Sequence, residues 1–165
     1  MRTSVTVSYP ADAERTAAML ASPAFQRGRI EGRGLSDVSV DVAPRGRGHV
    51  TTLRGAVPVD RLPAAAARFV RGAVAFEVLE SWGEPADDGS RTGSLEVTVK
   101  GAPVRAAGTL HLVPEGAATT QDVDLDFSVN VPLVGRRIEQ KALGYVNRVL
   151  RDEETRAAAW LAAHP

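Results

Sequence analysis

The 165-residue chain contains no cysteine, so disulfide bonds and thiolate chemistry are excluded. It also lacks any run of about 18 apolar residues, and we expect no segment to cross a bilayer as a helix. The first ten residues, MRTSVTVSYP, alternate in polarity instead of forming the apolar core of a signal peptide. These absences predict a cytoplasmic protein without a membrane span.

An excess of charge of either sign is missing as well. Lys and Arg total 20, Asp and Glu total 20, and the pI is about 6.8. Taken over the whole chain, this balance gives no field that would gather nucleic acid or an anionic membrane. We therefore expect no nucleic-acid partner.

Motifs for metals, cofactors and catalysis are equally absent. The three histidines, His49, His111 and His164, form no pair with metal-ligand spacing, and no G-x-S-x-G motif is present. The stretches GRGLSD and GRGHVT lack the third glycine of a dinucleotide fingerprint. Asp122, Asp124 and Asp126 alternate about 6–7 Å apart, which is typical of a solvated strand face rather than a cation site. We expect no metal and no cofactor.

The sequence does contain segments in which polar and apolar residues alternate. The length fits a single domain over residues 1–165. Period-2 patterns predict strands at 3–9, 38–42, 49–54, 73–82, 94–100, 104–113 and 122–131. Turns rich in Gly, Pro and Asp separate the last four, so we expect an antiparallel meander with one apolar face.

Helical periodicity occurs in three segments. ADAERTAAMLAS predicts a short helix capped by Asp12, and Asp60–Arg71 predicts another with Asp60 as its cap. The longest, Val134–Ala163, carries an apolar stripe through Val134, Ile138, Ala142, Tyr145, Val149, Ala157 and Trp160. Its polar interval RDEETR, 151–156, is where we expect the helix to bend or leave the sheet.

Small residues lie where sheet and long helix should meet. Ala106 and Gly108 are neighbours on the inner face of one strand, and Ala142 and Gly144 lie on or beside the helical stripe. They either let the helix approach the sheet closely or leave an internal cavity, and the sequence leaves both open.

Glu80 is the most informative polar residue. Continued alternation from Phe76 directs Glu80 and Trp82 inward, where a carboxylate should be hydrogen-bonded or have a raised pKa. A bulge near Ser81 would turn Glu80 outward instead. Tyr145 is a second source of a polar group for the same space.

Five arginines, Arg27, Arg29, Arg33, Arg45 and Arg47, cluster in two segments that are expected to be exposed turns. The alternative hypothesis for this cluster is an anionic headgroup held at a cavity mouth.

The order of elements resembles the helix-grip fold of the START-like superfamily, which includes lipid-transfer domains and polyketide cyclases, and within it a bacterial domain-of-unknown-function family. The resemblance rests on VSYPADAERTAAMLASPAF, ESWG, GSLEVTVKGAPVRAAGTLHLVPEG and VNVPLVGRRIEQKALGYVNRVLRDEETRAAAWLA. It implies an α+β fold in which a curved antiparallel sheet wraps around a long C-terminal helix, with short helices after the first strand. It also implies a hydrophobic cavity between sheet and helix. The alanine-rich first helix, Ala17–Ala21, departs from the commoner form.

The expected function is binding of a small hydrophobic ligand, such as a lipid, a polyketide or an isoprenoid-like molecule. The alternatives are a cyclase- or hydratase-like enzyme on the same scaffold and a protein-interaction domain with a filled interior. No catalytic residue is assigned. The residues expected to line the cavity are Phe76, Val78, Glu80, Trp82, Leu95, Val97, Ala106, Gly108, Leu110, Phe127, Val129, Ile138, Ala142, Tyr145 and Val149.

Overall fold

The computed structural model describes residues 1–165 and contains one seven-stranded sheet with the strand order β1-β7-β6-β5-β4-β3-β2. Every neighbouring pair of strands is antiparallel. The strands are β1 (Arg2–Tyr9), β2 (Ser36–Arg45), β3 (Gly48–Val57), β4 (Val74–Trp82), β5 (Arg91–Val99), β6 (Val104–Glu115) and β7 (Ala118–Val129). The predicted meander is confirmed, and β1 pairs with β7 at one edge of it.

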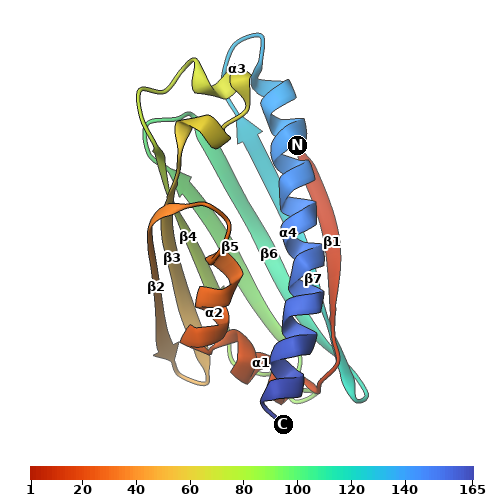
Figure 1. Ribbon diagram of the computed structural model, residues 1–165. Coiled ribbons are helices and arrows are strands. Elements are labelled where there is room, and N and C mark those ends of the chain that lie inside the picture. The colour runs from red at the N-terminus through yellow and green to blue at the C-terminus, as the bar shows by residue number, and fades with distance from the viewer.

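Helices occupy one side of this sheet (Figure 1). They are α1 (Ala13–Leu20), α2 (Pro23–Ile30), the 3-10 helix η1 (Val59–Arg61), α3 (Ala64–Ala67) and α4 (Gly135–Ala163). α4 packs on β1 and β7, whereas α2 packs on β2. The α+β arrangement of curved sheet and long C-terminal helix is confirmed. None of the helices combines the length and apolar character needed to span a bilayer.

Local chemistry fixes where the first two helices begin. The Asp12 carboxylate accepts a hydrogen bond from the Arg15 backbone N–H at 2.8 Å, which confirms it as the cap of α1. Ser22 caps α2, and Pro23 occupies the first turn, where its missing N–H has no partner to lose.

The expected alternation holds on the late strands. Leu110, Leu112 and Val123 are buried on the inner face, while His111 and Asp124 are exposed on the outer face. The three aspartates of β7 bond to β1, whose Arg2, Ser4 and Thr6 donate to Asp126, Asp124 and Asp122 respectively. Arg105 on β6 is paired with Ser128 and forms no ion pair with these aspartates.

The helix expected over residues 60–71 is much shorter in the structure. Only η1 and the four residues of α3 are helical, and Asp60 caps neither of them. Phe69, expected on the apolar face of this helix, is 60% exposed. A helix of this length needs a well-packed face to be stable, and here Phe69 is in solvent while Leu62, Ala66 and Val70 are only half-buried.

α4 is continuous through RDEETR, so the expected departure from the sheet is wrong. Glu153 and Ala157 are among its most buried residues, and Tyr145, expected on the stripe, is 47% exposed. The fully buried positions fall into two groups spaced by three or four residues, Gly135 and Ile138 at the start of α4 and Leu150, Glu153, Ala157 and Leu161 in its second half. The stripe is therefore rotated from the predicted one and includes a carboxylate.

The two glycines near the sheet–helix contact, Gly108 and Gly144, lie in different surroundings. A Cβ at Gly108 would collide with the backbone carbonyl of Asp124 on β7, so this glycine lets two strands approach each other. A Cβ at Gly144 would meet nothing within 4 Å. Gly144 therefore faces open space, and neither glycine brings α4 closer to the sheet.

We expect Gly108→Ala and Gly144→Ala to change stability in opposite directions. The first overpacks two strands and should lower the free energy of unfolding by about 1–3 kcal/mol. The second replaces glycine in an exposed helix interior and should raise it by up to about 1 kcal/mol. Urea unfolding monitored by circular dichroism measures both. A neutral Gly108→Ala would show that the strands can move apart freely.

Candidate functional site

Glu80 points into the molecule. β4 pairs with β3 and β5 without a register shift through Glu80, Ser81 and Trp82, so the outward-turning bulge is absent. The residue is 3% exposed. The inward interpretation of the alternation is confirmed for Glu80 and for Trp82.

Both carboxylate oxygens of Glu80 are engaged. The Trp82 indole N–H donates to Oε1 at 2.7 Å, and Nη1 of Arg29 lies 3.2 Å from Oε2. The expectation that an inward carboxylate is hydrogen-bonded is therefore met by one neutral donor and one charged donor.

Arg29 joins a second carboxylate to the first. Its Nη2 lies 2.9 Å from Oε2 of Glu153 on α4, and its Nη1 donates to Oε1 of Gln26 at 2.8 Å. Burial opposes the guanidinium charge, but Glu153 and Glu80 outweigh it and raise the pKa of Arg29. One side chain of α2 thus ties together β4 and α4.

Tyr9 extends the network to β1 and β7. Its hydroxyl lies 2.7 Å from Oε1 of Gln121 and 2.8 Å from Oε1 of Glu153, and its single proton is donated to one of these two acceptors at a time. Burial and the adjacent Glu153 charge raise the pKa of Tyr9 well above its ordinary value. We call Tyr9, Gln26, Arg29, Glu80, Trp82, Gln121 and Glu153 the buried network.

Two polar atoms beside this network have no hydrogen-bond partner. They are Nε2 of His49 and Oγ1 of Thr51, both on the inner face of β3 opposite Trp82 and Glu80. Burial lowers the pKa of His49, although the Glu80 charge opposes the shift. His49 is therefore neutral at pH 7.

The five arginines do not form one exposed cluster. Arg29 is in the buried network, and Arg33 donates to the Arg29 carbonyl at 2.5 Å. Arg45 and Arg47 are exposed at the β2–β3 turn, and Arg27 is exposed on α2. The expectation of an exposed turn is wrong for Arg29 because α2 carries it over the sheet.

Sequence reasoning missed most of the buried network. The alternation of residues 3–9 puts Tyr9 on the same face as Val5 and Val7, and the three- to four-residue spacing from Leu150 to Ala157 passes through Glu153. That spacing was available as a signal, but an acidic residue inside a polar run concealed it. Nothing in the sequence around Arg29 distinguishes it from Arg27.

The residues expected to line a cavity fall into three groups. Those that are buried are Glu80, Trp82, Ala106, Leu110, Val129 and Ile138; those that are half-buried are Phe76, Val78, Leu95, Val97, Gly108, Phe127, Ala142 and Val149; Tyr145 is exposed. The half-buried group contains no ionisable side chain.

The half-buried apolar residues of the sheet are neighbours. Cross-strand pairing places Phe76 beside Val99, Val78 beside Val97, and Leu95 beside Gly108. α4 packs on the far strands β1 and β7, and α2 packs on the opposite edge. Phe76, Val78 and Val97 on the inner face of β4 and β5 are each partly exposed to solvent, and we call this part of the inner face, on the side of α3 in Figure 1, the open half of the grip.

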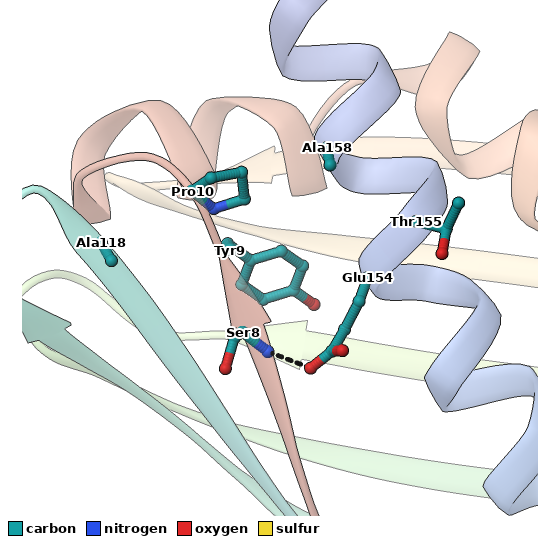
Figure 2. A pocket seen from close by; sticks show the side chains of 7 residues that line it. All are labelled: Ser8, Tyr9, Pro10, Ala118, Glu154, Thr155 and Ala158. Atoms are coloured by element: carbon teal, nitrogen blue, oxygen red, sulfur yellow. Dashed lines mark hydrogen bonds between the residues drawn. The ribbon is translucent and has the colours of Figure 1, made fainter.

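A wide surface depression lies elsewhere. Figure 2 shows it between the end of β1 and the last turns of α4, where the Ser8 N–H donates to Glu154 at 2.8 Å. It has a volume of about 490 Å³ and is wide open to solvent. It is lined by residues at the ends of β1 and β7 and on α4, and by none of β4 or β5.

Comparison with family models decides the classification. The model described as "Protein of unknown function (DUF2505)" matches residues 4–161. The chain belongs to this family. A search of curated proteins found no match.

Solved structures share the fold across nearly the whole chain. A Thermus thermophilus protein is 19% identical with a TM-score of 0.63, and the match covers 100% of both chains. A START superfamily protein from Mycobacterium smegmatis is 20% identical, with a TM-score of 0.53 over 94% of this chain and 96% of that one. The Zhui aromatase/cyclase from a Streptomyces species is 16% identical, with a TM-score of 0.55 over 96% of each. At these identities the likeness establishes the START-like fold alone.

We expect Arg29→Met to destabilise the protein by about 3–5 kcal/mol, because it leaves Glu80 and Glu153 buried without a countercharge. Urea unfolding measures the loss. Arg27→Met, on the exposed side of the same helix, is the matched control and should change stability by no more than about 0.5 kcal/mol. Equal effects of the two changes would mean that the ion pairs contribute little.

Acid should destabilise the fold through His49. Its pKa is lowered from 6.5 in the folded state, so the unfolded chain takes up a proton first as the pH falls. This contribution to stability is complete above pH 6.5 and is lost below it. We expect unfolding experiments at successive pH values to show that acid lowers the free energy of unfolding less for His49→Gln than for the parent. His111→Gln, at an exposed histidine, is the control, and acid should lower its free energy of unfolding as much as that of the parent.

Proposed function

We propose that the chain binds a small hydrophobic molecule in the open half of the grip. The observation that carries the proposal is the accessible, wholly apolar inner face around Phe76, Val78 and Val97. Such a surface is unusual inside a packed domain and is typical of ligand sites. A lipid, a polyketide or an isoprenoid-like molecule has the matching chemistry.

The buried network supports this location. It occupies the other half of the grip, where Leu110, Leu112 and Val123 are also closely packed. A ligand there would have to displace core side chains and separate Arg29 from its carboxylates. The open half requires no such loss, because its residues are already in contact with solvent.

Binding is favoured over catalysis by the state of Glu80. A general acid or base must reach the reacting atom of its substrate. Both oxygens of Glu80 are already hydrogen-bonded to Trp82 and Arg29, and the half-buried residues Phe76, Val78 and Val97 of the open half carry no ionisable side chain. The apolar face supplies desolvation, worth about 25 cal/mol per Å² of buried apolar area, and the polar end of the ligand stays toward solvent.

A neutral fluorescent probe, N-phenyl-1-naphthylamine, tests the proposal. We expect saturable binding to the parent and binding at least about tenfold weaker to Val97→Glu, because the probe would desolvate a carboxylate. The matched control is Thr98→Glu, one residue along β5 on the exposed outer face, which should bind as the parent does.

Two outcomes would count against the proposal. One is a folded parent that does not bind the probe, which would favour an interaction domain. The other is equal binding by Val97→Glu and Thr98→Glu, which would place the site outside the open half.

A further inference from the structure

The charges of the chain are balanced in total but not in space. The pairing of Val57 with Val74, of Phe76 with Val99 and of Val104 with Val129 brings three connections to one end of the sheet. These are residues 58–73, 100–103 and 130–134, and α4 starts directly after the last. Figure 1 shows α3 and the first turns of α4 together at this end.

This end is strongly basic. Residues 58–73, 100–103 and 130–141 contain seven Lys or Arg and two Asp or Glu. Arg136, Arg137 and Lys141 lie in the first two turns of α4, and none of them forms an ion pair. The remaining four, Arg61, Arg68, Arg71 and Lys100, are exposed and also lack ion pairs.

The opposite end has the reverse balance. Its connections, residues 10–22, 45–48, 83–90 and 115–118, contain six Asp or Glu and three Arg. The molecule therefore has a basic end and an acidic end, and the expectation from its total charge does not apply to either end separately.

Large apolar side chains project from the same basic end. Leu133 is fully exposed, Phe69 is 60% exposed and Val59 is 36% exposed. Leu133 also adopts φ 68°, a left-handed conformation that strongly disfavours a leucine. Packing inside the molecule does not explain a strained leucine whose whole side chain is in solvent.

We propose that this basic end docks on the surface of an anionic bilayer. The seven cations attract acidic headgroups, and Leu133 and Phe69 enter the boundary between headgroups and acyl chains. Neither observation alone requires a membrane, but cations around protruding apolar side chains match the two layers of a lipid surface. The open half of the grip faces α3 at this end, so a docked molecule presents it toward the lipid. The docking proposal goes beyond ligand binding and stands without it.

Vesicle cosedimentation tests docking. We expect the chain to bind vesicles containing about one third phosphatidylglycerol, to bind pure phosphatidylcholine vesicles poorly, and to lose binding in about 0.5 M salt. Arg136→Glu combined with Arg137→Glu should weaken binding at least about tenfold. Arg45→Glu combined with Arg47→Glu is the matched control, with the same charge change in exposed residues of a turn at the acidic end, and should not weaken it.

Leu133→Gly separates insertion from folding. Glycine tolerates the left-handed backbone, so the melting temperature should stay the same or rise. Vesicle binding should nevertheless fall about fivefold, because the inserting side chain is gone. A purely structural leucine would show the opposite pattern.

Three results would overturn the proposal. The first is that the parent does not bind the anionic vesicles. The second is that the double substitution at Arg45 and Arg47 weakens vesicle binding as much as the one at Arg136 and Arg137. The third is loss on Arg136→Glu and Arg137→Glu without loss on Leu133→Gly, together with full competition by heparin. That result would assign the basic end to a soluble polyanion such as nucleic acid. Because the probe and the vesicles are measured separately, failure of one does not imply failure of the other.

Discussion

The ion pairs of Arg29 with Glu80 and Glu153 are the constraint on which the rest of the structure depends. They join α2, β4 and α4, three elements far apart in the chain, at a point where both carboxylates are buried and the Arg29 side chain is only 14% exposed. Two buried carboxylates against one guanidinium are tolerable only when further donors satisfy them, and Trp82 and Tyr9 do so. The network thereby fixes how α4 lies across the sheet, and the rotation of its stripe toward Glu153 follows.

Closure of one half of the grip leaves the other half accessible. The packed half contains the buried network and the main apolar core, and both α1 and the last turns of α4 contribute to it. The half toward α3 has only short helical turns over it, because Pro63 and the lack of a packing partner keep that segment from forming a longer helix. The difference between the halves therefore originates in where the chain supplies a long amphipathic helix and where it does not. Ligand binding is proposed for the accessible half, and membrane docking is proposed for the basic end beside it.

The sequence predicts much of the fold because the fold depends on periodicity. Alternation located the late strands and their inner faces, and the stripe after Gly135 located the long helix. For Glu80 the sequence left an inward side chain and an outward-turning bulge both open, and the unbroken register of β4 decides for the inward one. Pairing between distant polar residues has no such periodic signal. Arg29 and Arg27 look alike in sequence, and the RDEETR run suggests an exposed segment although Glu153 is the centre of a buried network. The role of Gly108 also depends on the carbonyl of a neighbouring strand, which no local pattern reveals.

The division into a packed half and an accessible half is the central claim, and intermolecular nuclear Overhauser effects from bound N-phenyl-1-naphthylamine test it most directly. The account predicts contacts from the probe to the methyl groups of Val78 and Val97 and none to those of Val7 and Leu112, which are buried beside the network. Contacts to Val7 and Leu112 instead would contradict it, because the probe would then occupy the half that the Arg29 ion pairs are argued to close.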